Sequence, residues 1–150
     1  MSTRPSRGPS DDRRSPTETS FGGVAIRGED VLVITPAGRR RIVALPKGGP
    51  HAGETGEQTA EREVREETGI NVEVREPLGD VSYWYRRDGR RIRKTVHFYL
   101  CEFVSGSTAD HDHEVDDARW IPLLEALTAL TYPGERELIE RALTKLASGQ

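Results

Sequence analysis

The sequence predicts an α/β protein in which helices cover a mixed β-sheet. Two observations indicate this class. Short apolar runs separated by glycine, proline and aspartate have the pattern of strands, and longer segments with apolar residues at helical spacing have the pattern of helices. The 150 residues are enough for one domain with a real core. Because we see no internal repeat and no second domain, we expect a single folded unit.

The expected strands are short and end at turn residues. Their ranges are 21–27, 31–34, 41–45, 72–74, 81–85, 92–103 and 118–121. Glycine, proline and acidic residues separate the first three strands, as is typical of turns. The Asp88-Gly89 pair predicts a hairpin between strands 81–85 and 92–103. Because strand 92–103 carries apolar residues on both faces, we expect it in the middle of the sheet.

Three helices are expected between and after these strands. The first begins near Thr55 or Glu57 and ends before Gly69, a residue type that favours helix C-termini. Ala60 and Val64 share the face of this helix that should pack on the sheet. The other two helices are expected at 122–130 and 134–147, the last with an apolar stripe of Leu138, Ile139, Ala142, Leu143 and Leu146.

The beginning of the chain differs in composition from the rest. Residues 2–20 contain no large apolar side chain and are rich in Ser, Thr, Pro, Arg and Asp. We therefore expect residues 1–19 to form a disordered tail and residues 20–150 to form the folded domain. No stretch has the pattern of a signal peptide or a membrane span, which predicts a cytoplasmic protein without a membrane partner. The single cysteine, Cys101, lies among apolar residues and is expected to be a packed strand thiol.

The segment from Gly48 to Ile70, GGPHAGETGEQTAEREVREETGI, carries the main functional signal. A glycine-rich loop precedes a helix on which Glu63, Glu66 and Glu67 share one face, and Arg62 is expected to point away from them. Three carboxylates this close repel one another unless they share a proton or a cation. A hard divalent cation such as Mg²⁺ suits an all-oxygen cluster and also binds phosphate oxygens. The segment therefore predicts a metal–phosphate site.

The same segment resembles the signature of the Nudix hydrolases. That signature has a glycine, five residues, a glutamate, seven residues and then R-E-U-x-E-E-x-G-U, where U is aliphatic. Its fixed positions are filled here by Gly48, Glu54, Arg62, Glu63, Val64, Glu66, Glu67, Gly69 and Ile70. The preceding Leu45-Pro46-Lys47 is also similar to the family. The resemblance implies a more specific fold, an α/β/α sandwich around a mixed central sheet.

The family resemblance also implies a reaction and a set of residue roles. The reaction is hydrolysis of a nucleoside diphosphate linked to another group, X, with Mg²⁺ as the cofactor and Mn²⁺ as a substitute. The implied metal ligands are Glu63 and Glu67, with Glu66 and the Gly48 carbonyl as further ligands. Glu54 and Arg62 are implied to pair and to brace the loop, which is a structural role. The sequence leaves open which glutamate is the general base, and Glu63 and Glu66 are candidates.

Glu114 is a further candidate, because it lies in an acidic loop shortly before Trp120. Many Nudix enzymes place an extra acidic metal ligand or a general base in such a loop. The alternative interpretation is a solvated loop, since the neighbours of Glu114 include Asp110, Asp112, Asp116 and Asp117. His111 and His113 have a spacing that suits a transition metal on a strand, but in this polar loop we expect them to be solvated.

Several cations and aromatic residues are candidates for substrate binding. Lys47, Arg41 and Lys94 are expected to contact phosphates, and Tyr83 and Tyr85 are expected to stack on a base. The hairpin around Asp88-Gly89 is basic, with Arg86, Arg87, Arg90, Arg91, Arg93 and Lys94. The alternative interpretation is that these charges are solvated at an edge of the sheet and prevent aggregation. The alternation along a strand also requires some of the aromatic side chains to face the core.

Weaker sequence similarities suggest a subgroup within the Nudix family and a class of substrate. The strand Arg91–Leu100 and the segment 130–133 resemble Nudix diadenosine polyphosphate hydrolases and a MutT-like, mutator-type bacterial branch. We expect a nucleotide substrate, with dinucleoside polyphosphates first and oxidised nucleoside triphosphates such as 8-oxo-dGTP as the alternative. An RNA 5′-end pyrophosphohydrolase and a non-catalytic nucleotide-sensing module are further alternatives. The formal net charge of −3 argues against a general nucleic-acid partner. We expect a monomer or a homodimer.

Overall fold

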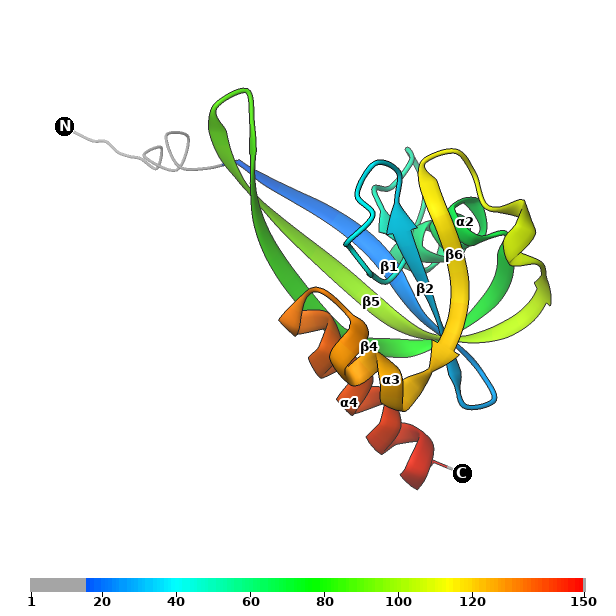
Figure 1. Ribbon diagram of the computed structural model, residues 1–150. Helices are drawn as coiled ribbons and strands as arrows, with labels where there is room; N and C mark the ends of the chain where they lie inside the picture. Colours follow the sequence, from blue (N-terminus) through cyan, green and yellow to red (C-terminus); the bar gives the residue numbers. More distant parts are fainter. Residues whose placement is uncertain (1–15, 150) are drawn as a thin grey trace.

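The computed structural model describes residues 16–149, and the statements below concern these residues. Six strands form one mixed sheet in the order β4-β5-β1-β2-β6, with β3 paired to β1 (Figure 1). Helix α2 covers one face of the sheet, and helices α3 and α4 cover the other. The expected α/β/α sandwich is therefore confirmed.

Neighbouring strands of the sheet are mostly antiparallel. Their bounds are β1 Thr17–Arg27, β2 Asp30–Pro36, β3 Lys47–Gly48, β4 Ile70–Arg87, β5 Arg90–Gly106 and β6 Val115–Pro122. Strands β1 and β5 are parallel, while β1–β2, β1–β3, β2–β6 and β4–β5 are antiparallel. Strand β5 lies between β4 and β1, as the apolar residues on both of its faces predict. The predicted turn at Asp88 and Gly89 has positive φ at both residues, as a tight hairpin requires.

The helices lie where the sequence predicts them. Their bounds are α2 Gly56–Thr68, α3 Leu123–Ala129 and α4 Pro133–Ser148, with a short 3₁₀ helix, η2, at Thr108–Asp110. Helix α2 begins after Thr55 and ends at Gly69. On α4, Leu138, Ile139 and Ala142 are buried, whereas Leu146 is exposed at the end of the expected stripe. None of the helices in residues 16–149 is long and apolar enough to cross a membrane.

The structure corrects three expectations about the elements. Residues 17–19 belong to β1, paired with residues 93–95 of β5, so the expected tail extends too far; residues 1–15 lie outside the described part. Segment 41–45 is a loop whose backbone pairs with β2 only at the isolated Ile34–Ala44 bridge. The two strands expected at 72–74 and 81–85 are parts of one strand, β4, which passes Pro77 through register shifts. Proline is tolerated there because β4 is an edge strand.

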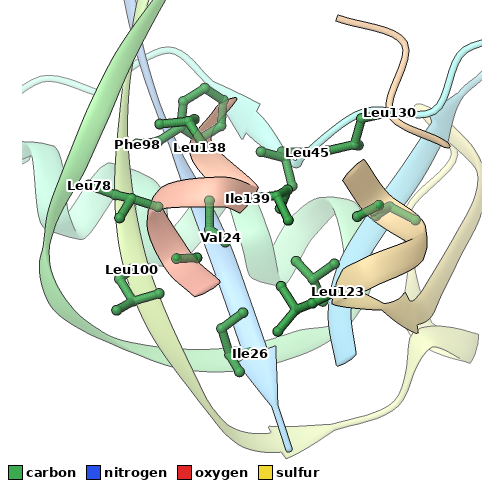
Figure 2. Close-up of a cluster of buried hydrophobic side chains, with 14 of the residues drawn as sticks. Val24, Ile26, Leu45, Leu78, Phe98, Leu100, Leu123, Leu130, Leu138 and Ile139 are labelled. Carbon is green, nitrogen blue, oxygen red and sulfur yellow. The ribbon is translucent and has the colours of Figure 1, made fainter. Parts of the chain in front are cut away.

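The larger core fills the space between the sheet and helices α3 and α4. Figure 2 shows Val24 and Phe98 of the sheet facing Leu138 and Ile139 of α4. Leu45 of the loop before β3 lies in this same cluster and is completely buried. A smaller core includes Val64 of α2 and Cys101 of β5. Both α2 and the loop that leads to β3 are therefore fixed by burial of apolar surface, and their junction is the site described next.

Candidate active site

Helix α2 holds the three glutamates in a fixed orientation. Thr55 accepts a hydrogen bond from the Gln58 N–H, and the Gln58 side chain accepts one from the Thr55 N–H, so the helix begins with a capping box. Ala60 and Val64 are completely buried against the sheet. Because the apolar face is fixed in this way, the neighbouring face with Glu63, Glu66 and Glu67 is turned toward the loop that contains Gly48.

The loop and the helix touch at Gly48 and Lys47. The Lys47 backbone N–H donates to Glu67 Oε1 at 3.0 Å. A β-carbon built on Gly48 would overlap the carboxyl group of Glu63, so only glycine permits this approach. Pairing of β3 with Phe21 and Gly22 of β1 holds both loop residues in place. The structure thus brings Gly48, Glu63 and Glu67 together.

Arg62 lies among acidic groups. Its Nε donates to Glu54 Oε2 at 2.7 Å, and its Nη2 donates to Glu54 Oε1 at 3.0 Å and to the Gly49 carbonyl at 2.8 Å. Its Nη1 contacts Glu63 Oε2 at 3.1 Å and Glu66 Oε1 at 3.0 Å. The expectation that Arg62 points away from the carboxylates is wrong, because the long guanidinium group reaches both the loop and the next helical turn. Hydrogen bonds from Arg62, with help from the His51 N–H, lower the pKa of Glu54 to about 2.

The pKa values of two of the glutamates are raised when no cation is bound. Burial raises the pKa of the Glu67 carboxyl to about 8, against the opposing hydrogen bond and charge of Lys47. Burial also raises the pKa of Glu63, while Arg62 opposes this shift and the charges of Glu66 and Glu114 add to it. A cation would relieve both effects, because it compensates the charge of the buried carboxylates.

The acidic loop before β6 approaches the same end of α2. The Asp112 N–H donates to the Glu66 carbonyl at 3.1 Å, which joins this loop to the helix. The charge of Asp112 raises the pKa of Glu67, and the charge of Glu114 raises that of Glu63, so both acids lie near the cluster. Glu114 and His113 are exposed, while His111 bonds through Nδ1 to the Asp112 carbonyl at 2.9 Å. Neither histidine belongs to a group of three potential metal ligands within residues 16–149.

The oxygen donors of Gly48 and the glutamates are of the type that a hard divalent cation prefers, although the side chains do not yet converge as a complete set of metal ligands. Within residues 16–149, no three acidic, histidine or cysteine side chains already converge at metal-ligand spacing. Arg62 contacts the carboxylates of both Glu63 and Glu66, so these oxygens are paired with a guanidinium. The donors are nevertheless all oxygens, two of them on partly buried acids, and the absence of a side chain at Gly48 lets its backbone approach the Glu63 carboxyl closely. This donor set suits Mg²⁺ or Mn²⁺ better than a softer metal.

A cationic cleft of about 580 Å³ lies beside the carboxylate cluster. Its lining includes Lys47, Lys94, Arg39 and Arg87, together with the acidic Glu18. Burial lowers the pKa of Lys94, and the charge of Lys47 lowers it further, while Glu67 and Glu63 raise it. The charges of Lys47, Glu63 and Glu67 therefore all act on the Lys94 ammonium. Arg41 was expected in this place, but Arg39 lines the cleft and Arg41 is not among its residues.

Tyr83 and Tyr85 of β4 line the cleft, as expected, and both also make contacts within the protein. Tyr83 is half-buried, packs edge-on against Tyr132 at 4.8 Å between ring centroids and donates its hydroxyl to Glu135. Tyr85 donates to Glu18 Oε1 at 2.5 Å. Both line the cleft with their hydroxyls already bonded, whereas Trp84 is 52% exposed and its ring is covered by Arg91. Stacking of a base on Tyr83 or Tyr85 remains a prediction.

Sequence reasoning missed Glu135, Asp112 and Glu18. Each lies far along the chain from the signature loop, and Glu135 contacts a residue 90 positions away. One weak signal was available for Glu135, since it lies in the first turn of the expected last helix, where an acid is favoured. No comparable signal distinguished Asp112 from the other aspartates of its loop.

The chain is similar in sequence to known proteins. The model of the NUDIX domain family matches residues 16–142. The chain is 45% identical to "Putative mutator protein MutT4" of Mycobacterium tuberculosis over 94% of its own length and 60% of the relative's. It is 34% identical to an 8-oxo-(d)GTP phosphatase of Mycolicibacterium smegmatis over 65% of its own length and 29% of that protein. The chain thus spans less than two thirds of the length of either relative.

A solved structure shares the fold. The Ap4A hydrolase of C. elegans superposes with a TM-score of 0.69 at 22% sequence identity, covering 87% of this chain and 98% of that one. At this identity the likeness concerns the arrangement of the elements and leaves the substrate open.

Proposed function

The chain belongs to the NUDIX family, and from this premise we propose that it is a divalent-metal-dependent hydrolase of nucleoside diphosphates linked to another group. One observation carries the proposal. The loop of Lys47 and Gly48 contacts Glu63 and Glu67, and Lys47 also lines a cleft together with Lys94. Such a junction suits a polyphosphate, because cations can hold its outer oxygens while acids hold the metal at the bond to be cleaved.

The proposed metal ligands are the acids of the junction. Glu63 and Glu67 are assigned as the main ligands, with Glu66, the Gly48 carbonyl and Glu114 as further ligands. When bound, Mg²⁺, or Mn²⁺ in its place, neutralises phosphate oxygens and lowers the pKa of a coordinated water. Glu54 and Arg62 are assigned a structural role, which their two hydrogen bonds support. Arg62 would also have to release Glu63 or Glu66 when a cation binds, since it now contacts both.

The proposed reaction is a displacement at phosphorus. Water attacks one phosphorus, a new P–O bond forms, the bridging P–O bond breaks, and the leaving phosphate takes the electron pair. A carboxylate accepts the proton of the attacking water. Glu63, Glu66 and Glu114 are the candidates for this base. Glu66 and Glu114 are exposed, which suits access to water, whereas Glu63 packs against Gly48 and Arg62.

Dinucleoside polyphosphates are the substrate class that we propose first. Four cations line the cleft, and they match the several charges of a polyphosphate chain better than a single diphosphate. Lys47 and Lys94 are assigned to the phosphates next to the metal, and Arg39 takes the place expected for Arg41. Tyr83 and Tyr85 are assigned to the wall that receives a nucleoside.

Oxidised nucleoside triphosphates are the second candidate. This alternative rests on the relatives, one of which is an 8-oxo-(d)GTP phosphatase. The same cleft would hold the triphosphate, and Tyr83 and Tyr85 would then discriminate the oxidised base rather than accept any base.

A side-by-side substrate panel tests both candidates. The purified protein with Mg²⁺ is assayed against diadenosine tetraphosphate, diadenosine hexaphosphate, 8-oxo-dGTP, ADP-ribose and 5′-triphosphate RNA, and against each with EDTA. We expect the diadenosine compounds to have the highest kcat/KM and EDTA to abolish turnover. Preference for 8-oxo-dGTP would move the assignment to the second candidate. Hydrolysis that persists in EDTA would contradict the proposed chemistry itself.

A further inference from the structure

Glu135 is a completely buried carboxylate at the start of α4. Removing an acidic group from water is costly, and close hydrogen-bond donors must compensate this cost. The position in the first turn of α4 contributes, because the partial positive charge of a helix N-terminus favours an anion. The remaining compensation comes from three side-chain or backbone donors outside the helix.

These three donors come from two separate parts of the chain, the segment of Leu45 and Lys47 and the strand of Tyr83. The Leu45 N–H donates to Glu135 Oε1 at 2.9 Å. The Lys47 ammonium lies 3.1 Å from Oε2, and the Tyr83 hydroxyl donates to the same oxygen. Glu135 therefore contacts the loop before β3, the Lys47 side chain at the wall of the cleft, and strand β4. Lys47 and Tyr83 both line the cleft, so the carboxylate lies directly behind the surface that we assign to the substrate.

The environment of Lys47 shows what this contact does. The ammonium lies 5.8 Å from the centroid of the Tyr83 ring and 5.7 Å from that of Tyr132. The backbone N–H of the same lysine donates to Glu67 Oε1 at 3.0 Å, so Glu67 lies close to the base of this side chain. Without Glu135, the flexible lysine stem would be free to turn its charge toward Glu67. With Glu135, the ammonium is held at the cleft wall and Glu67 stays available as a ligand.

We propose that Glu135 is a positioning residue that fixes the Lys47 ammonium for binding of the substrate polyphosphate. It acts through Lys47 and does not touch the substrate. The inference rests on the proposed function for the identity of the substrate, while the arrangement of Glu135 and Lys47 is independent of it.

The test is a double-mutant cycle of Glu135→Gln and Lys47→Met. Glutamine keeps the shape and can still accept the Leu45 N–H, but it lacks the charge that holds the ammonium. Two quantities are measured: KM and kcat for diadenosine tetraphosphate with Mg²⁺, and the Kd for inorganic tripolyphosphate in EDTA by calorimetry. Glu137→Gln, an exposed acid on the same helix, is the matched control.

For Glu135→Gln we expect both KM and Kd to rise about tenfold, as the loss of one charge-assisted contact predicts, with kcat within about threefold of wild type. In the Lys47→Met background the same change should add less than about twofold, because its partner is already gone. The control should leave both constants unchanged. Wild-type constants in Glu135→Gln, or effects that multiply fully in the double variant, would overturn the proposal.

A milder variant covers the case in which Glu135→Gln does not fold. Tyr83→Phe removes one donor to Glu135 and retains the ring, and we expect it to raise the tripolyphosphate Kd about two- to threefold only when Lys47 is present. An equal effect with and without Lys47 would count against the proposal. If the wild type hydrolyses no nucleotide but tripolyphosphate binding shows the expected coupling, the proposed function fails and the positioning role stands.

Discussion

Replacing Gly48 by alanine would perturb the contact between the signature loop and helix α2. A β-carbon at Gly48 would overlap the Glu63 carboxyl group, whereas a β-carbon at Gly49 would meet no atom within 4 Å. Neither glycine has positive φ, so alanine strains neither backbone. Gly49→Ala is therefore a matched control one residue away.

The expected magnitudes differ for stability and activity. The overlapping atoms are the end of a flexible side chain, so Glu63 can relieve the clash by moving about 1 Å. This limits the loss in free energy of unfolding to about 1 kcal/mol, the low end for overpacking. A misplacement of about 1 Å at a reacting centre lowers the rate about a hundredfold. We expect Gly48→Ala to lose about this factor in kcat/KM, and Gly49→Ala to stay near wild type.

Three measurements follow the two variants. Urea unfolding gives the stability, hydrolysis of the best substrate of the panel gives kcat/KM, and calorimetric titration with Mn²⁺ gives the metal affinity. The metal affinity should fall in Gly48→Ala together with the activity. Full activity in Gly48→Ala, or an equal loss in Gly49→Ala, would refute the reasoning that Gly48 is required for its closeness to Glu63.

Two further predictions concern stability and reactivity. Hydrogen bonds from Arg62 hold the pKa of Glu54 at about 2 in the folded protein against 4.5 as the ordinary value, so the stability from this pair is complete above about pH 4.5 and is lost as the pH falls toward 2. Glu54→Gln should be less stable than wild type at pH 7 in urea unfolding, and the difference should disappear near pH 2; a constant difference would exclude the ionised pair. Burial raises the pKa of the Cys101 thiol to about 12, so the native protein should react very slowly with a thiol-specific disulfide reagent at pH 8 and completely in urea. Fast reaction of the native protein would contradict the burial.

Local features of the fold could be predicted from the sequence, because their causes are local. Thr55 and Gly69 mark the ends of α2, and Asp88-Gly89 marks the hairpin, at the residues that form these features. The expected strand 41–45 failed, because its apolar residues Val43 and Leu45 pack into the core from a loop. Apolar alternation alone does not distinguish the two situations.

In the candidate site, too, the contacts within one segment could be predicted from the sequence and the contacts between distant segments could not. The glycine loop and the glutamates of α2 lie in one continuous segment, so their proximity could be predicted. Glu135 could not be placed, since its contacts with Leu45 and Lys47 depend on how α4 packs across the sheet. The direction of Arg62 was mistaken for a different reason. Glu66 lies four residues after Arg62 and therefore on the same side of the helix, so the spacing itself allows their contact.

The central claim is that Glu67 binds the cation on which hydrolysis depends, and Glu67→Gln tests it most directly. Burial raises the pKa of this carboxyl to about 8, so the acid is largely protonated at pH 7 without metal, and glutamine imitates that form. The unfolding midpoint should therefore stay near that of wild type. Glu57→Gln, an exposed change on the same helix, is the control.

The measurement is kcat/KM for the best substrate of the panel at saturating Mg²⁺, with the urea midpoint recorded for each protein. The account predicts a loss of about a thousandfold or more in Glu67→Gln at an unchanged midpoint, and wild-type activity in Glu57→Gln. Undiminished turnover in a folded Glu67→Gln protein would contradict the metal role of Glu67 and the account built on it.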